Sequence, residues 1–362
     1  SLNNVDHKMN QYKSFKDSPV AYFCAEYALF DYDSLYAGGL GILSGDYVNA
    51  IIKEKFPAVA IGLFYYKDDE LGTGLDNRNT TPDKLGLNLV KDKNGSTLKI
   101  PLLLNQKKIL VQAWLYEKEN LKLFLLDTHI EENEKEYWTI CDTLYDDNRL
   151  TRLRQEIVLG IGGMKLIEKL GINPSVYHLN EGHSSFMAFE LIQKEMSTNG
   201  KNFEEAVKCA KNHIVFTNHT LVPAGQEMFD VDVMKSIFSR YLKDKGLTID
   251  NLINLGIDKE RNMFSMTLFA LNMSSRVNSV SKKHMDEALK VWRGYNVANV
   301  TNGIDIDRWD LFKYYSHKEL KRKLIEYIKK SSNISIDDDT LIIGWARRFA
   351  DYKRPTVILK DV

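Results

Sequence analysis

The chain has 362 residues, with 49 basic and 49 acidic side chains and therefore a formal net charge of zero. This length corresponds to roughly two domains or one large one, and 44% hydrophobic with 27% charged residues is an ordinary globular balance. A chain without net positive charge is not expected to bind nucleic acid through a basic surface.

Three cysteines, Cys24, Cys141 and Cys209, are too few and too scattered for a disulfide framework or a zinc knuckle. No apolar run reaches about 18 residues, so neither a transmembrane helix nor a membrane partner is expected. The polar N-terminus lacks the apolar core of a signal peptide. These observations favour a cytoplasmic protein with free thiols.

The first half of the chain alternates apolar runs with helical patterns. After a polar leader at 1–18, the run at 20–25 predicts a buried strand, and the glycine-rich turn at 38–41 leads into a helix expected over about 45–56. The run at 58–65 predicts a second strand. This strand–turn–helix–strand unit is typical of parallel α/β sheets.

Residues 97–127 contain two or three strand-like runs separated by short polar turns, which predict an antiparallel insertion. The alternation then resumes. In chain order we expect a helix at 149–170, a strand at 176–179, helices at 184–196 and 203–212, a strand at 214–216, helices at 263–275 and 281–292, and a strand at 297–300. This order predicts a Rossmann-like, doubly wound, mostly parallel sheet with ligands at the carboxyl ends of its strands.

A new pattern starts near the C-terminus. A basic helix at 317–330 is followed by a polar stretch, then by an apolar run at 341–345 that predicts a fresh buried strand, and Pro355 is well placed to start a helix. The expected organisation is a polar leader at 1–18, a Rossmann-like domain at 19–335, and at 336–362 the opening strand and helix of a second, truncated Rossmann-like domain.

The turn formed by Gly38, Gly39, Leu40 and Gly41 lies between a predicted strand and a predicted helix. Glycines at such a place let backbone N–H groups approach an anion, and the helix N-terminus adds its dipole. The spacing also fits a loose dinucleotide-binding turn. We therefore expect a phosphate cradle of some kind at Gly38, Gly39 and Gly41, with a plain packing turn as the alternative.

Polar residues follow three predicted strands, in the segments 178–183, 217–220 and 301–303. The carboxyl ends of parallel strands meet at one edge of a sheet, so these clusters suggest a site for a multiply hydroxylated ligand. A metal site would need His178, Glu181 and His183 to converge. Because His178 lies within the strand, its side chain is expected to point elsewhere, and no metal is expected.

Four cationic residues lie within residues 347–354, directly after the predicted strand at 341–345. Arginines near a helix start can bind a phosphate in bidentate fashion. A solvated loop is the alternative reading of the same charges. The sequence contains no Ser-His-Asp spacing, P-loop or HExxH motif.

Together these residues resemble the α-glucan phosphorylases, the family of glycogen, starch and maltodextrin phosphorylases, and in particular its short bacterial branch. Each matching block is weak alone, but their common order along the chain is highly specific. The blocks are residues 22–26, 36–46, 154–160, 178–184, 216–220, 301–303 with Trp309, and 346–354.

The resemblance implies a GT-B fold of two Rossmann-like domains with the active site in the cleft. It implies reversible phosphorolysis, in which α-1,4-glucan and inorganic phosphate give glucose 1-phosphate and a shortened glucan. The family uses pyridoxal 5'-phosphate, whose phosphate group relays a proton. Its cofactor lysine lies in the second domain, beyond Val362, so the chain alone is expected to be inactive. Assembly into a homo-oligomer stays open.

The resemblance also implies roles for individual residues. Gly39 would offer a backbone N–H to the substrate phosphate, which Arg348 and Lys353 would clamp. His219 would contact the terminal glucose, partly through its backbone carbonyl, next to the developing positive charge. The other implied substrate contacts are Glu26, Leu40, Glu181, His183, Asn302 and Tyr352, and Trp309 would lie near the cofactor.

Two other functions stay open. A different GT-B glycosyltransferase would use a sugar nucleotide, and a non-catalytic remnant would bind glucan without turnover. A dinucleotide-dependent dehydrogenase uses only the glycine turn and leaves the other blocks without a role. Every version of a glucan site requires Gly39, Glu181, His219 and Asn302 to gather around one hollow.

Overall fold

The computed structural model divides the chain into two compact units, Ser1–Gly303 and Ile304–Val362. The structure describes residues 15–30, 34–66, 80–222, 225–245, 247–345, 354 and 356–360. Most of the predicted leader lies outside the described residues. No helix among the described residues has both the length and the apolar content needed to cross a bilayer.

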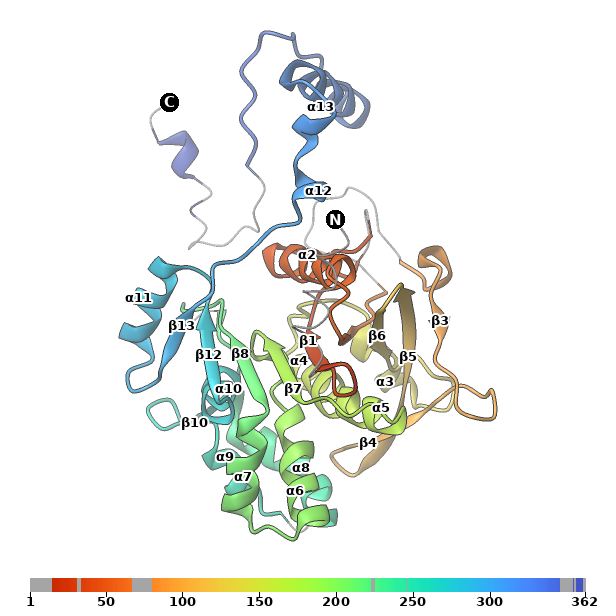
Figure 1. Ribbon diagram of the computed structural model, residues 1–362, viewed down its shortest axis with the longest axis vertical. Helices are drawn as coiled ribbons and strands as arrows, with labels where there is room; N and C mark the ends of the chain where they lie inside the picture. The colour runs from red at the N-terminus through yellow and green to blue at the C-terminus, as the bar shows by residue number, and fades with distance from the viewer. Residues whose placement is uncertain are drawn as a thin grey trace. The chain divides into compact units, whose positions relative to one another are not determined.

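The first unit is built on a ten-stranded sheet with the strand order β13–β12–β8–β7–β1–β2–β6–β5–β3, and β4 pairs with β5 (Figure 1). The strands from β13 to β6 pair in parallel. They are β13 (Val297–Asn299), β12 (Arg276–Ser279), β8 (Ile214–Thr217), β7 (Val176–Asn180), β1 (Val20–Cys24), β2 (Ala58–Leu63) and β6 (Leu121–Asp127). The predicted mostly parallel α/β sheet is confirmed.

The sheet grows in two directions from β1. Strands β2 and β6 add on one side of β1, whereas β7, β8, β12 and β13 add on the other. Doubly wound sheets bind their ligands where the strand order reverses, outside the carboxyl ends of the strands. In this chain that point lies at the ends of β1 and β7.

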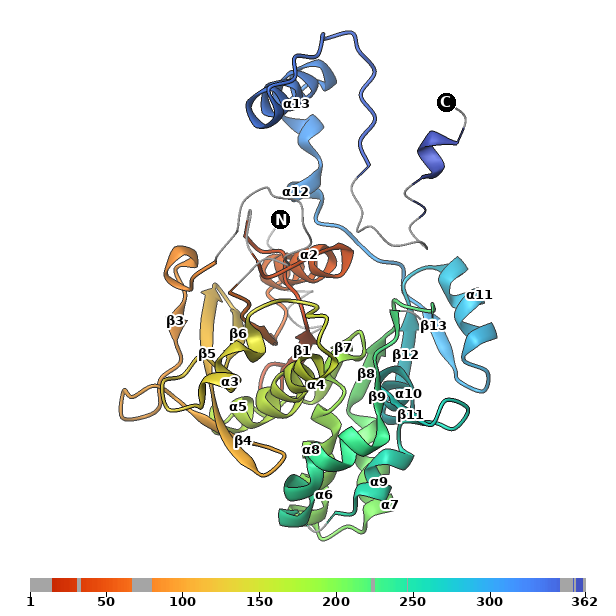
Figure 2. The same cartoon turned by 180° about the vertical axis from the view of Figure 1, so that it is seen from behind.

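Strand β1 is buried on both faces. Val20, Tyr22 and Cys24 join an apolar cluster with helix α2 (Gly39–Lys53), whereas Ala21 and Phe23 join a larger cluster with α4 and α5 on the opposite face (Figure 2). Successive side chains of a strand point to opposite faces. A strand covered on both sides therefore reads as a continuous apolar run, which is the signal that predicted it.

The helix predicted over 149–170 is interrupted in the middle. Helices α4 (Arg149–Ile157) and α5 (Gly163–Lys169) flank a π-helical turn at Val158–Gly162. A Cβ on Gly160 would lie 2.7 Å from the backbone nitrogen of Met187 and 2.8 Å from the carbonyl oxygen of Ser184. At Gly160 the helix backbone thus packs directly against the backbone of the segment after β7. Such π-turns occur frequently at functional sites.

The predicted antiparallel insertion is confirmed, and its last strand also belongs to the parallel sheet. Strands β3 (Asn88–Leu89), β4 (Ile100–Leu104) and β5 (Lys107–Lys118) are all antiparallel to their partners. Strand β6 pairs antiparallel with β5 and parallel with β2. The insertion therefore extends the main sheet beyond β6.

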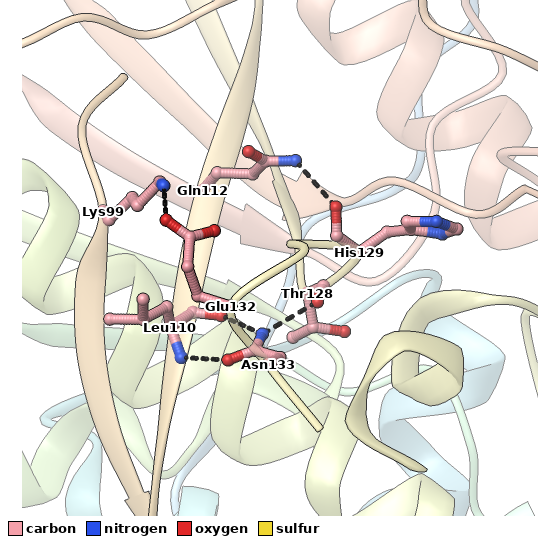
Figure 3. Close-up of polar contacts among 7 residues, drawn as sticks. All are labelled: Lys99, Leu110, Gln112, Thr128, His129, Glu132 and Asn133. Carbon is pink, nitrogen blue, oxygen red and sulfur yellow. Dashed lines mark hydrogen bonds and ion pairs between the residues drawn. The ribbon is translucent and has the colours of Figure 1, made fainter. Parts of the chain in front are cut away.

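The side chain of Asn133 continues the β5–β6 ladder beyond its last pair, Gln112 and Asp127. Figure 3 shows the contacts of Asn133. Asn133 Oδ1 accepts a hydrogen bond from the backbone N–H of Leu110 at 2.8 Å, and Asn133 Nδ2 donates to the Leu110 carbonyl at 2.8 Å. The same Nδ2 donates to the Thr128 carbonyl at 2.9 Å. These contacts keep buried backbone groups paired beyond the last rung.

Three of the predicted helices begin elsewhere. The helix expected at 184–196 begins at Met187, after a 3-10 turn at Gly182–Ser184. Helix α2 begins at Gly39, so the glycine turn itself forms its first turn, and the helix expected at 263–275 begins at Met266 because Met263–Ser265 pairs as a strand. The other elements of this unit are α3 (Lys135–Trp138), α6 (Met187–Asn199), α7 (Phe203–Asn212), α8 (Val231–Asp244), α9 (Ile249–Asn254), α10 (Met266–Met273), α11 (Lys282–Val291), and a small sheet of β9 (Met228–Asp230), β10 (Ile257–Asp258) and β11 (Met263–Ser265).

The second unit contains α12 (Ile306–Trp309) and α13 (His317–Ser332). The predicted buried strand at 341–345 is wrong, because Leu341 is 82% exposed and this segment has no regular structure. A strand needs a neighbour for its backbone groups, and the described residues of this unit supply none. The domain boundary at residue 335 and the truncated second domain stay predictions.

Candidate functional site

Glu26 joins the glycine turn to the end of β1. Its Oε2 accepts hydrogen bonds from the backbone N–H groups of Ala37 at 2.8 Å and Gly38 at 3.2 Å. A Cβ on Gly41 would lie 2.8 Å from the same oxygen and 2.4 Å from the Cβ of Tyr36. Gly41 is therefore a packing glycine, and a protein carboxylate already uses one N–H group of the predicted phosphate cradle, that of Gly38.

Gly38 and Gly39 differ from Gly41, because a Cβ at either position would meet nothing within 4 Å. Gly38 is the N-cap of α2 and Gly39 is its first residue, at the positive end of the helix dipole. The backbone at Gly39 leaves room for an anion. Leu40, in contrast, packs partly buried against the apolar cluster of α2.

Glu181 and His219 meet at the ends of β7 and β8. Glu181 Oε2 accepts a hydrogen bond from the backbone N–H of His219 at 3.0 Å, and Oε1 accepts from the N–H of Gly182 at 3.3 Å. The φ angle of Glu181 is 69°, a conformation that residues other than glycine adopt rarely and that often marks functional sites. Burial raises the pKa of Glu181 to about 7.

His219 is held through both its ring and its carbonyl group. Its Nε2 lies 2.6 Å from Asn180 Oδ1, and its carbonyl oxygen lies 2.9 Å from Nε2 of His284. Burial, with smaller effects of His284 and His178, lowers the pKa of His219 to about 4. The ring is therefore neutral at pH 7. It donates through Nε2 to the Asn180 oxygen, which leaves Nδ1 as an acceptor.

His178 belongs to a different polar group, as its place within the strand predicted. Its Nε2 lies 2.8 Å from Thr217 Oγ1, and Thr217 donates to Asn278 Oδ1 at 2.8 Å. Burial lowers the pKa of His178 to about 4. This chain of contacts crosses β7, β8 and β12 inside the sheet.

A small cavity lies between the ends of β1 and β7 and helix α4. Its volume of about 10 Å³ is close to the space that one water molecule needs. It is lined by Ala25, Leu63, Tyr65, Leu144, Tyr145, Arg152, Gln155, Glu156, Leu159 and His183. The cavity is too small for a glucosyl group.

Tyr145 connects this cavity with the glycine turn. Its hydroxyl donates to Glu26 Oε1 at 2.5 Å, and its ring centroid lies 4.9 Å from the Arg152 guanidinium carbon and 5.9 Å from the centre of the His183 ring. Arg152 also forms an ion pair with Glu227. Contacts therefore run from the glycine turn through Glu26 and Tyr145 to His183.

The structure brings five of the predicted site positions to the carboxyl ends of neighbouring strands: Glu26, the turn at 38–41, Glu181, His183 and His219. That Asn302 joins them stays a prediction. Asn302 is exposed beyond the edge strand β13, where its backbone N–H donates to the Val280 carbonyl at 3.0 Å. Its side chain has no hydrogen bond to this group among the described residues.

The remaining predicted site residues lie elsewhere in the chain. Trp309 is the last residue of α12, in the second compact unit. Arg348, Tyr352 and Lys353 lie outside the described residues. Their implied phosphate, sugar and catalytic roles stay predictions.

Sequence reasoning missed several residues of this region, namely Tyr145, Arg152, Glu156, Glu227 and His284. A signal was available for Glu156, since a glutamate directly before the apolar run 157–161 is expected to be buried. Tyr145 and Glu227 lie in loops, where only tertiary contacts decide what a side chain meets.

Comparison with known proteins agrees with this geometry. A family model described as carbohydrate phosphorylase matches residues 163–317. Maltodextrin phosphorylase of Thermococcus litoralis is 33% identical over 96% of this chain and 48% of its own length. Glycogen phosphorylases of Aquifex aeolicus and Mycobacterium tuberculosis are 28% and 27% identical, over 98% and 94% of this chain and 61% and 48% of their own lengths.

The chain thus spans between about half and three-fifths of the length of these relatives. The resemblance to α-glucan phosphorylases is confirmed by these relatives.

Proposed function

We propose that this chain acts in the phosphorolysis of α-1,4-glucan, as a glycosyltransferase that moves the terminal glucosyl group to inorganic phosphate. The products are glucose 1-phosphate and a glucan shortened by one unit. One observation carries the proposal: contacts run from the glycine turn at an open helix N-terminus to His183, and Glu181, two residues earlier in the chain, holds His219. All of these residues lie along the ends of β1, β7 and β8. The relatives named as maltodextrin and glycogen phosphorylases give the substrate class.

The phosphate would bind at Gly39. Glu26 already accepts the N–H groups of Ala37 and Gly38, and the N–H of Ile42 donates to the Gly38 carbonyl, so the N–H groups of residues 39–41 are the ones available to a substrate anion. The dipole of α2 adds to their attraction. Arg348 and Lys353 would supply the opposing positive charge.

The sugar would bind beside His219 and Glu181. Displacement at an anomeric carbon develops positive charge, and fixed dipoles aimed at that charge lower the barrier. The His219 carbonyl is such a dipole, held by its contact with His284. Neutral His219 offers Nδ1 as an acceptor for a sugar hydroxyl. A phosphate nucleophile removes the need for a pair of protein carboxylates, which glycoside hydrolysis requires.

The family uses pyridoxal 5'-phosphate, and we propose the same cofactor for the protein. The small cavity between β1, β7 and α4 is not its site, because that cavity has room for about one water molecule. The contribution of the described residues is to bind and orient the substrate.

We also propose a cytoplasmic location, supported by three unpaired cysteines, of which Cys24 and Cys141 are buried. Such thiols are typical of a reducing compartment. Self-association of the chain stays a prediction.

Ligand binding tests the proposed function. Calorimetric titration of the chain with maltoheptaose and with glucose 1-phosphate is expected to show saturable binding of both. Gly39→Ala is expected to weaken glucose 1-phosphate binding about tenfold, because its methyl group would occupy the space left for the anion. Gly344→Ala, also in open space, is the matched control and is expected to change neither ligand's affinity.

The alternatives give different results. Binding of a nucleotide sugar in preference to glucose 1-phosphate would favour a sugar-nucleotide glycosyltransferase. Binding of maltoheptaose without any binding of phosphate or glucose 1-phosphate would favour the non-catalytic glucan-binding protein. If the chain binds none of these ligands, the proposed site is wrong.

A further inference from the structure

Two side chains that line the small cavity, Glu156 and His183, meet Glu227 beside it. Glu156 comes from α4, His183 follows β7 and Glu227 precedes β9. Each offers one ligand atom, a carboxylate oxygen or a ring nitrogen, and these atoms all lie within 4.8 Å of one another. The metal site considered from the sequence was a different one, formed by His178, Glu181 and His183, and no metal was expected there. Glu156 and Glu227 lie outside that segment.

The cavity has polar walls that lack partners. Glu156 is only 3% exposed, and among the described residues neither of its carboxyl oxygens has a hydrogen-bond partner. The Nδ1 atom of His183 is buried and equally unpartnered. Leaving a buried polar group unpaired costs about 1–3 kcal/mol, and more for a charged one. Two such groups facing one cavity indicate that something binds between them.

Size and charge limit what that occupant is. The cavity has room for one water molecule or one ion. The carboxyl group of Glu156 lines it, and that of Glu227 lies within 4.8 Å of the ligand atoms of Glu156 and His183. The carboxylate of Glu26 contacts the cavity wall through Tyr145, and Arg152 is a cationic group in the lining. A divalent cation takes the carboxylate oxygens and the ring nitrogen as ligands together and displaces the proton of Glu156.

We propose that the cavity binds one divalent transition-metal ion through Glu156, His183 and Glu227. Carboxylate and imidazole ligands suit manganese, iron and zinc. The ion pair of Arg152 with Glu227 is compatible with this, because a carboxylate has about four lone-pair sites and can serve both partners. An outer partner of this kind orients a metal ligand.

The ion would act as a positioning element. It would connect α4 and the segment before β9 to the segment after β7. That last segment carries Glu181, which accepts a hydrogen bond from the backbone N–H of His219. No contact between the ion and a substrate follows from the geometry. The metal site therefore stands independently of the proposed glucan chemistry.

Manganese binding to the full chain tests the proposal. The chain is treated with a chelator, desalted and titrated with Mn²⁺, and electron paramagnetic resonance separates free from bound metal. Mn²⁺ is the probe because thiolate ligands such as that of Cys209 bind it poorly. We expect about one Mn²⁺ per chain, displaced by Zn²⁺, and Glu156→Gln is expected to weaken binding about tenfold or more.

The controls separate a metal site from a folding effect. Glu168→Gln removes an exposed carboxylate from α5 and is expected to leave Mn²⁺ affinity unchanged. Circular dichroism checks that each variant is folded, and His183→Gln replaces Glu156→Gln if the latter does not fold. Absence of saturable Mn²⁺ and Zn²⁺ binding by the unmodified chain, or equal binding by the folded variants, overturns the proposal in favour of a buried water.

Discussion

Two buried carboxyl groups near the same edge of the sheet have opposite surroundings. Asp127, at the end of β6, is fully buried and accepts hydrogen bonds from Tyr66 at 2.7 Å, from Gln112 and Trp114 at 3.0 Å each, and from the backbone of His129 at 2.8 Å. Glu156, in α4, is almost as deeply buried and accepts none among the described residues.

The difference shows how to tell a structural acid from one that awaits a ligand. Burial is the same for both, so burial alone does not distinguish them. What distinguishes them is whether the protein itself supplies the hydrogen-bond donors. Asp127 holds the antiparallel extension to the main sheet, whereas Glu156 faces the cavity described above.

The largest expected effect comes from Asp127→Ala. This change leaves four donors in buried or part-buried hydrogen bonds without their acceptor, so we expect the free energy of unfolding to fall by about 3–5 kcal/mol. Urea denaturation measures it. A loss below about 1 kcal/mol would contradict the structural role of Asp127 and weaken the comparison.

The next effect is a pH dependence from the histidines. Burial lowers the pKa of His183 to about 3 and that of His219 to about 4, below the value near 6.5 expected in the unfolded chain. The unfolded state therefore takes up protons first, and stability is lost as pH falls from about 6.5 toward 4. At pH 5 each histidine is expected to cost about 2 kcal/mol relative to pH 7.5.

His183→Gln isolates one of these protons. The variant is expected to lose less stability than the unmodified chain when urea denaturation is repeated at pH 7.5, 6.5, 5.5 and 5.0. Parallel curves for the two proteins would show that His183 is solvated, and the cavity would then not be as closed as the structure has it.

Glu181 lies between the two extremes, because it accepts backbone hydrogen bonds but has a raised pKa of about 7. A folded-state pKa above the unfolded value near 4.5 means that stability is lost as pH rises from about 4.5 to 7. The stability of Glu181→Gln minus that of the unmodified chain is therefore expected to be higher at pH 7.5 than at pH 5, by about 1–3 kcal/mol. The difference between the two denaturation midpoints measures this, and the opposite sign would refute it.

The smallest expected effect is that of Glu156→Gln in the absence of metal. Burial raises the pKa of Glu156 well above its ordinary value, so the side chain is already neutral, and an amide of the same size disturbs no hydrogen bond. We expect a change in unfolding free energy within about 1 kcal/mol. A loss as large as that of Asp127→Ala would show that Glu156 has structural partners after all.

Sequence patterns predicted the centre of the fold better than its edges. Strands β1, β7 and β8 were visible because burial on both faces leaves apolar runs. Strand β12 was missed, since Arg276–Ser279 contains one apolar residue and its position depends on pairing with β8 and β13. The apolar run at 341–345 predicted a strand that the structure does not have, because an apolar stretch becomes a strand only beside another strand.

The candidate site was predictable in part for similar reasons. Glu181, His183 and His219 follow strands directly, so topology alone placed them on one edge. Asn302 follows a strand too, but β13 is the sheet's edge and two strands away from β8. Glu156 and Tyr145 reach the same region from a helix and a loop, and no spacing along the chain encodes such a meeting.

The glycine at position 160 has a mechanical consequence. With no side chain between them, the helical rod of residues 149–169 and the strand-to-helix corner at residues 184–187 touch through their main chains. Soft side-chain rearrangements cannot absorb a relative slip at such a joint. A displacement of the helical segment is therefore expected to displace this corner as well. The loop that carries His183 would then move together with Arg152 and Glu156.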